Sequence, residues 1–456
     1  MDTDTAPQHP TRGLRSPGIK FLIIAALTVA MAIPLLFIQF ALSDRESTAA
    51  GAVQDIASGW GGSQVVAGPL LLLPYTEMRE QVIDGKTVQA VQRETAVLLP
   101  ENLSFKARAN EETRWRGIFA VPVYRSNIAM HATFTKASIA GLVPQGATIL
   151  WNEASIAVLV SDAHGLADNV ALTVNGQSVP FQPGAGFTAG YNPNGSPTQL
   201  NGMHAPIALP APADLTLDTR FDLRGSRELS FSPLGRRTTA SMTSEWNSPS
   251  FFGAFLPTDR KVGADGFTAS WVVPYLARGF GQSFESTDDA VGQVLSPASG
   301  VRFYQPVDHY QLVQRSLKYA ILFIALAFLV FFVVETVSPT RLHAVQYALV
   351  GAAQALFYLL LLSFCEHIGF ANAYIVASLA TIGLTTLYAI SALRNKFRAV
   401  VLGIILLMLY GLLYIILNAE DYALVIGSSL LFVALAATMY VTRRIDWYRA
   451  TDMESA

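Results

Sequence analysis

The stretch HAVQYALVGAAQALFYLLLLSFCEHIGF, residues 343–370, decides the class of fold that this chain adopts. It opens on His343, continues through a long apolar run, and closes on Cys365, Glu366 and His367. About 20 apolar residues of helix cross a bilayer core of about 30 Å, and this run has that length. The stretch therefore predicts a membrane-spanning helix with polar residues at each end.

Five further segments have the same length and character, at residues 19–42, 319–337, 371–393, 399–417 and 422–441. With the opening stretch they predict a bundle of six transmembrane helices, one N-terminal and five C-terminal. The composition agrees, since 52% of the 456 residues are hydrophobic and 14% are charged. The predicted parts are a tail (1–18), a first span (19–42), an exported domain (43–318), a five-helix bundle (319–441) and a second tail (442–456).

The tails and short loops at one set of ends of the predicted spans contain basic residues. They are Arg12, Arg15 and Lys20, then Arg341, then Arg394, Lys396 and Arg398, and finally Arg443, Arg444 and Arg449. The short loops at the alternate ends, residues 365–370 and 418–421, contain no Lys or Arg. Because short cytoplasmic flanks are rich in these residues, we expect both termini in the cytoplasm and residues 43–318 in the periplasm.

A cleaved signal peptide is the alternative for the first span, because STAAGA at residues 47–52 supplies small residues. The length of the apolar segment and the charged residues 44–46 that follow it favour a retained membrane anchor. Pro34 within this segment predicts a kink. In both cases the domain that follows is exported.

The exported domain has the pattern of a β-rich, sandwich-like fold, with many short alternating segments separated by turns. It contains no G-x-S-x-G, H-E-x-x-H or P-loop motif. Asp162 and His164 in SDAHGL are compatible with a serine triad, but turn formation is the simpler explanation of these residues. Trp115, Trp246 and Trp271 are better explained as core residues than as the lining of a lipid or carbohydrate cleft. The arginines of RWR (114–116), with Arg125, fit a solvated strand face better than an anion site.

Two polar groups at the ends of the spans are the candidate functional clusters. The first is in the outer loops, at Glu366, His367, Glu420 and Asp421, and the second is at the cytoplasmic face, at Glu335, Arg341, His343 and Gln346. Arg341 is the predicted partner of Glu335. A metal site at Cys365, Glu366 and His367 would need ligands from the other outer loop, so a polar helix cap is the favoured interpretation.

The sequence predicts no cofactor, metal or catalytic residue. The only cysteine, Cys365, excludes an intramolecular disulfide and a Cys-based zinc site. The net charge of −2 argues against a nucleic-acid partner. The expected partners are the lipid bilayer and an envelope protein or lipid, and the sequence leaves the oligomeric state open.

Several blocks along the chain carry a family resemblance: RGIFAVPVY (116–124), GSRELSFSPLG (225–235), PSFFGAFLP (249–257), TRRIDWY (442–448) and the opening stretch. With them the chain resembles the CreD family, bacterial inner-membrane proteins described as cell envelope integrity proteins. The resemblance implies a role in envelope integrity and stress response. It brings no reaction and no catalytic residues.

Three functions are compatible with these observations. The first is a non-enzymatic scaffold whose periplasmic domain binds an envelope partner. The second is a protein that handles or transports a lipid or small envelope solute through a cavity between bundle and domain. The third, a hydrolase, requires a nucleophile and a base within hydrogen-bond reach in the β-rich domain.

Overall fold

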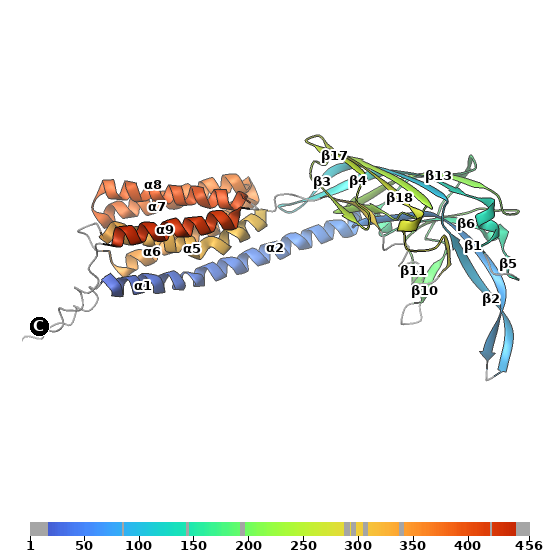
Figure 1. The fold of residues 1–456 in the computed structure, drawn as a ribbon, viewed down its shortest axis with the longest axis horizontal. Coiled ribbons are helices and arrows are strands. Elements are labelled where there is room, and N and C mark those ends of the chain that lie inside the picture. The colour runs from blue at the N-terminus through green and yellow to red at the C-terminus, as the bar shows by residue number, and fades with distance from the viewer. Residues whose placement is uncertain are drawn as a thin grey trace, which may run out of the picture. The chain divides into compact units, whose positions relative to one another are not determined.

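The computed structural model describes residues 17–83, 86–142, 146–191, 197–286, 292, 298–303, 309–336, 342–419 and 422–443. The chain divides into a helical unit, Met1–Ala49 with Val307–Ala456, and a β-rich unit, Ala50–Pro306 (Figure 1). This architecture confirms the predicted fold class of a transmembrane bundle with a large β-rich domain.

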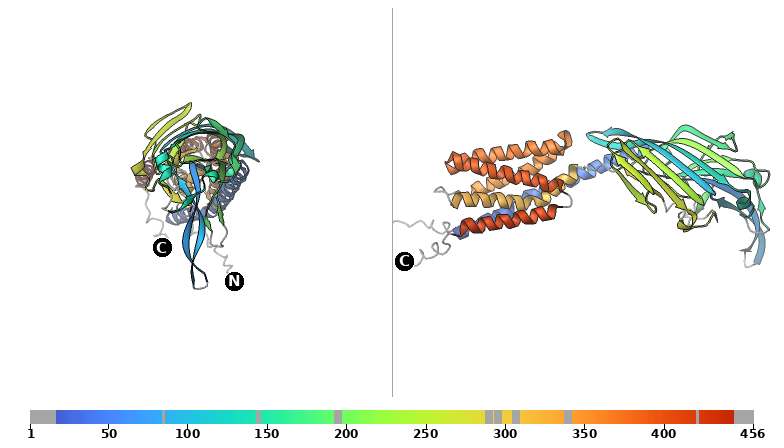
Figure 2. Two further views of the ribbon diagram at one scale, coloured as in Figure 1. Left: turned by 90° about the vertical axis from the view of Figure 1, so that its right-hand side faces the viewer. Right: turned by 45° about the horizontal axis from the view of Figure 1, so that its top comes forward.

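Among the described residues, the helical unit contains an N-terminal segment of two helices and five C-terminal helices, and they run side by side (Figure 1, Figure 2). Among the described residues, five helical segments are long and apolar enough to cross a membrane, and a shorter apolar helix, Val425–Tyr440, follows them in the chain. The bounds are α1 (Pro17–Ala30), α2 (Ala32–Trp60), α5 (His309–Thr336), α6 (Ala344–Ile368), α7 (Phe370–Leu393), α8 (Lys396–Asn418) and α9 (Ala423–Thr442).

The first predicted span is broken at Met31, between α1 and α2. Pro34 explains the break, because proline has no N–H and its ring clashes with the carbonyl four residues earlier, that of Ala30. The prediction of a kink near Pro34 thus agrees with the break. The sequence analysis predicts that the β-rich domain begins at residue 43, whereas helix α2 continues to Trp60. Residues 44–59 contain no proline and several alanines, so helix propensity extends past the end of the apolar run.

At Gly351, α6 packs closely against α5 and against Met31, the residue between α1 and α2. A Cβ atom added at Gly351 would lie 2.6 Å from Phe328 Cζ and 2.8 Å from Met31 Sδ. Small residues allow transmembrane helices to approach closely, so Gly351 sets the packing distance at this point.

Among the described residues, ten strands form the first sheet of the β-rich unit. Its central strand, β1 (Gln64–Ile83), lies between β6 (Ser155–Val160) and β14 (Glu228–Phe231). The pairing of β1 with β14 is parallel, with Gln64 opposite Leu229. The other strands are β2 (Lys86–Leu98), β5 (Thr148–Ile149), β9 (Gln182–Pro183), β12 (Gly202–Pro206), β16 (Pro249–Gly253), β19 (Ser283–Glu285) and β20 (Ser299–Phe303).

The second sheet has the order β17-β18-β15-β3-β4-β13-β7-β8. Its strands are β3 (Asn102–Arg116), β4 (Phe119–Phe134), β7 (Leu166–Val174), β8 (Gln177–Val179), β13 (Leu215–Ser226), β15 (Arg237–Ser244), β17 (Asp259–Gly263) and β18 (Gly266–Pro274). A short helix, α3 (Lys136–Ala140), and a separate ribbon of β10 (Thr188–Tyr191) and β11 (Pro197–Gln199) complete the unit.

The two sheets pack face to face around one apolar core. Phe231 of the first sheet contacts Phe105 and Trp271 of the second, with ring centres 5.3 and 5.6 Å apart. Trp246 is also buried in this core, whereas Trp115 is 68% exposed. The core interpretation therefore holds for two of the three tryptophans. Alternate residues of β3 and β13 face the core, which leaves a polar outer face on the second sheet.

The hairpin of β1 and β2 continues beyond the rest of its sheet (Figure 1). From Glu77 onward, β1 pairs only with β2 among the described residues. Met78 and Val91, directly opposite each other on this hairpin, are 62% and 68% exposed. The arm therefore presents two unpaired strand edges and an apolar pair of side chains.

Candidate functional site

The first polar cluster of the bundle is the Glu335 clamp, made of Lys20 on α1, Glu335 on α5, and Leu342 and Tyr347 at the start of α6. The Lys20 ammonium forms an ion pair with Glu335 and donates to the Leu342 carbonyl at 2.7 Å. The Tyr347 hydroxyl and the Leu342 amide donate to the two Glu335 oxygens at 2.8 and 2.9 Å. Because Glu335 is only 7% exposed, these donors compensate for its removal from water.

The clamp adds an ion-pair partner of Glu335 that the sequence analysis does not name, and the prediction of Arg341 stays untested. Lys20 is the ion-pair partner of Glu335, and the predicted partner, Arg341, lies outside the described residues. His343 and Gln346 do not contact Glu335 in the described contacts. They form a capping box at the start of α6, in which the His343 side chain accepts from the Val345 amide and Gln346 Oε1 accepts from the His343 amide. Their geometry is that of a helix cap.

The second polar cluster is the Glu366 clamp, made of Arg45 on α2, Tyr310 on α5 and Glu366 on α6. The Tyr310 hydroxyl donates to Glu366 Oε1 at 2.9 Å, and Arg45 Nε lies 3.9 Å from the same oxygen. His367 points elsewhere: it is exposed, and its Nδ1 lies 3.2 Å from the Ser363 carbonyl of its own helix. Glu420 and Asp421 lie outside the described residues.

Further polar side chains are buried in the middle of the bundle. The Tyr410 hydroxyl donates to Gln354 Oε1 at 2.6 Å, and the Tyr374 hydroxyl donates to the Tyr410 carbonyl at 2.6 Å. The Gln354 amide nitrogen and the Thr385 hydroxyl have no hydrogen-bond partner among the described residues. Unpaired polar atoms are costly in a bilayer, so these two positions need an explanation.

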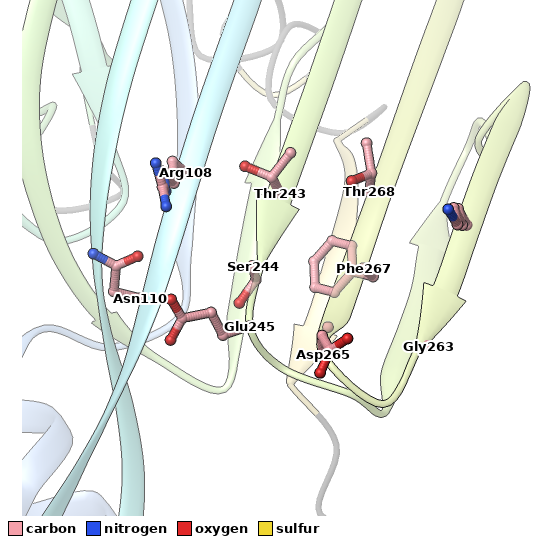
Figure 3. A pocket seen from close by; sticks show the side chains of 11 residues that line it. Arg108, Asn110, Thr243, Ser244, Glu245, Gly263, Asp265, Phe267 and Thr268 are labelled. Carbon is pink, nitrogen blue, oxygen red and sulfur yellow. The ribbon is translucent and has the colours of Figure 1, made fainter.

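The outer face of the second sheet carries a groove of about 460 Å³ (Figure 3). Strands β3, β15, β17 and β18 and the turns next to them supply its walls. Arg108 and Thr243 are directly opposite each other in neighbouring strands, and so are Thr243 and Thr268. The remaining lining includes Asn110, Ser244, Glu245, Lys261 and Asp265, so the groove offers both charge signs and several hydroxyl groups.

Asp162 and His164 form a turn in which their side chains are also in contact, with His164 Nδ1 2.8 Å from Asp162 Oδ1. Asp162 caps the 3₁₀ turn Ala163–Gly165, because its side chain accepts from the His164 amide at 3.0 Å. It also accepts from the Gly62 amide at 3.0 Å. Partial burial acts to raise the pKa of Asp162, but the hydrogen bonds from Gly62 and His164 prevail and lower this pKa.

One other row of residues has the composition of a triad. His131 Nδ1 lies 2.8 Å from Asp218 Oδ1, and Ser104 is opposite His131 in the neighbouring strand. Among the described residues, Ser104 forms no hydrogen bond with His131. The two ion-pair members are 49% and 61% exposed on an open sheet face. This row lacks the nucleophile–base contact that a hydrolase requires.

Comparison with known proteins identifies the family. The family model described as "Inner membrane protein CreD" matches residues 16–448. The inner membrane protein CreD of Escherichia coli (strain K12) is 36% identical over 438 residues, which cover 95% of each chain. The chain belongs to the CreD family. It is therefore an inner membrane protein, as its apolar helices predict.

A crystal structure of a "putative nutrient binding protein" from Legionella pneumophila is a more remote match to this CreD-family chain. It is 10% identical, covers 56% of this chain and 88% of its own, and has a TM-score of 0.28. This TM-score is too low to indicate a shared fold.

Sequence reasoning missed Lys20, Tyr347, Arg45 and Tyr310 as clamp residues of this CreD-family chain. A lysine at the end of the first span and tyrosines close to the ends of other spans are visible in the sequence. Their partners are far away in the chain, however, and only packing of the helices brings them together.

Proposed function

We propose that this CreD-family protein supports cell envelope integrity and the envelope stress response as a non-enzymatic scaffold. The bundle anchors it in the inner membrane, and the β-rich domain binds an envelope protein or lipid. Both termini lie in the cytoplasm and the β-rich domain lies in the periplasm: the tails and the short loops at one set of helix ends contain arginines and lysines, and the short loops at residues 365–370 and 418–421 contain none.

The contrast between the bundle and the groove supports this proposal most strongly. In the bundle, Glu335 and Glu366 are each held by a basic side chain and a tyrosine of the same unit. Such pairing accounts for these buried carboxylates without transport. In the groove, the charged side chains of Arg108 and Lys261 are exposed and have no ion-pair partner among the described residues.

A second function is favoured by the unpaired Gln354 amide and Thr385 hydroxyl. A protein that handles a lipid or a small solute needs polar groups within the bundle that its cargo can satisfy. On this alternative the bundle, and not the groove, carries the function.

Complementation of a deletion strain under envelope stress distinguishes the two functions. The groove variant is Arg108→Ala/Lys261→Ala, and its matched control is Arg220→Ala, an exposed arginine of the same sheet that does not line the groove. The bundle variants are Gln354→Leu and Glu366→Ala/His367→Ala. Membrane levels of all variants are matched by blotting.

If the protein is a scaffold, we expect the groove variant at normal abundance to fail to complement the deletion strain. The control and the bundle variants should complement it. Loss of rescue by Gln354→Leu, together with full rescue by the groove variant, would reject the scaffold in favour of the handling function.

A further inference from the structure

Three arginines surround one tryptophan in the β-rich unit. The guanidinium carbons of Arg114, Arg125 and Arg224 lie 4.1, 4.9 and 5.2 Å from the centre of the Trp60 ring. Trp60 is the last residue of α2, and its indole N–H donates to the Tyr124 carbonyl at 3.4 Å. The indole ring at the end of α2 thus lies among three arginine side chains, one each from β3, β4 and β13.

The strand register makes this arrangement costly without a ligand. Arg125 and Arg224 are directly opposite each other on neighbouring strands, a position at which like charges repel. Cation–π contact with the indole offsets part of the repulsion. The repulsion that remains is not explained by the packing of α2, and it indicates that the site binds a ligand of opposite charge.

The charges in the cluster are not balanced. Glu112 is the one carboxylate paired with it among the described residues, at 3.1 Å from Arg114 and 2.5 Å from Arg125. Arg224 has no carboxylate within ion-pair distance there, and its Nε atom is buried without a hydrogen-bond partner. A buried guanidinium N–H that lacks an acceptor is the position that an oxyanion fills.

We propose that the cluster of Trp60, Arg114, Arg125 and Arg224 binds a phosphate-type oxyanion. Guanidinium groups match phosphate oxygens in a bidentate geometry, and clusters of arginine are the usual recognition device for this chemistry. Arg224 is the central donor, and the more exposed Arg114 and Arg125 close around the anion. This site is distinct from the groove on the outer face of the second sheet, since none of its four residues lines that groove.

The test is calorimetric titration of the full-length protein in a neutral detergent at fixed ionic strength. One arm uses inorganic phosphate, and the other uses a water-soluble short-chain phosphatidic acid. We expect wild-type binding in at least one arm, and Arg224→Gln raises the dissociation constant at least about tenfold. Phosphatidic acid that binds at least about tenfold more tightly identifies a lipid headgroup, and equal binding identifies the free anion.

The matched control is Arg220→Gln, which removes an exposed arginine from the same face of β13 and leaves binding unchanged. If Arg224→Gln fails to fold, Arg125→Gln decides the question, because its side chain is 53% exposed and its loss leaves the core intact. Absence of binding by the wild type in both arms overturns the proposal. Binding that is unchanged in Arg125→Gln, or in a folded Arg224→Gln, also overturns the proposal.

Discussion

The two clamps of the bundle have the same composition but different environments. Each joins a glutamate to a basic residue of the N-terminal helix and to a tyrosine of another helix. In the Glu335 clamp, the carboxylate comes from α5 and the tyrosine from α6. In the Glu366 clamp these two helices exchange roles. The N-terminal segment is therefore joined to the same helix pair at two points, through Lys20 of α1 and Arg45 of α2.

Solvent exposure separates the two clamps. The two glutamates are similarly buried, with Glu335 7% and Glu366 9% exposed, but Lys20 is 22% exposed whereas Arg45 is 51% exposed and lies 3.9 Å from Glu366. A buried pair is strongly destabilised when one partner is lost, because the other charge stays out of water. A partner that is half exposed and distant, as Arg45 is, contributes less. Similar residues should thus give very different mutational effects at the two ends.

The largest effect is expected for Glu335→Ala. This change leaves Lys20 partly buried and removes the acceptor of Tyr347 and of the Leu342 amide, so we expect a loss of about 3–5 kcal/mol in unfolding free energy. Thermal unfolding of the purified protein in detergent measures it. Lys20→Met/Glu335→Met is the control, because removal of both charges costs less than removal of one. A loss below about 1 kcal/mol for Glu335→Ala would mean that the pair is solvated.

A smaller loss is expected for Gly351→Ala, which tests whether packing or charge joins the N-terminal helix to α6. The added methyl group meets Phe328 and Met31, which must shift, so we expect a loss of about 1–3 kcal/mol. Gly383, whose added Cβ meets nothing within 4 Å, provides the matched Gly→Ala control on α7. Equal stability of the two variants would show that the helices can separate at no cost.

The Glu366 clamp should show weak coupling. A double-mutant cycle with Arg45→Met and Glu366→Gln is expected to give a coupling energy of about 0.2–1 kcal/mol, because Arg45 is half exposed and distant. The same cycle with Lys20→Met and Glu335→Gln is the comparison. Coupling of equal size in the two cycles would remove the distinction between the clamps.

His367→Ala should have the smallest effect, within about 0.5 kcal/mol of the wild type. The side chain is exposed, and its one described contact is the carbonyl of Ser363 on its own helix. Melting curves measured side by side with those of Glu366→Ala test this expectation. A larger loss for His367→Ala than for Glu366→Ala would show that His367 has a partner beyond its own helix.

The sequence predicts the helices and the β-rich class because both rest on local patterns. An apolar run of sufficient length is visible without any partner, and so is the alternation along β3 and β13. The sequence predicts the nearby Arg341, which lies outside the described residues, as the partner of Glu335, and it gives no sign of the ion pair with Lys20, at the other end of the chain. Such pairs depend on which helices pack together, and local sequence patterns do not specify helix–helix contacts.

Some candidate site residues are likewise predictable from the local sequence, and others depend on how the chain packs. Glu366 and His343 are predictable as polar helix ends, and the structure places both there. The cluster at Trp60 combines α2 with β3, β4 and β13, and no local signal links the RWR segment to Arg224. The groove has the same origin, since its walls come from separate strands of the second sheet.

The parallel pairing of β1 with β14, and of β3 with β15, has a consequence for how the chain acquires its structure. Both early strands must wait for partners that come much later in the sequence, so the β-rich unit has a high contact order and should fold slowly. Until β14 and β15 arrive, the edges of β1 and β3 are open to wrong partners. Newly made copies of this protein should therefore depend on chaperones, and they should be vulnerable to proteolysis until the later strands join the sheets.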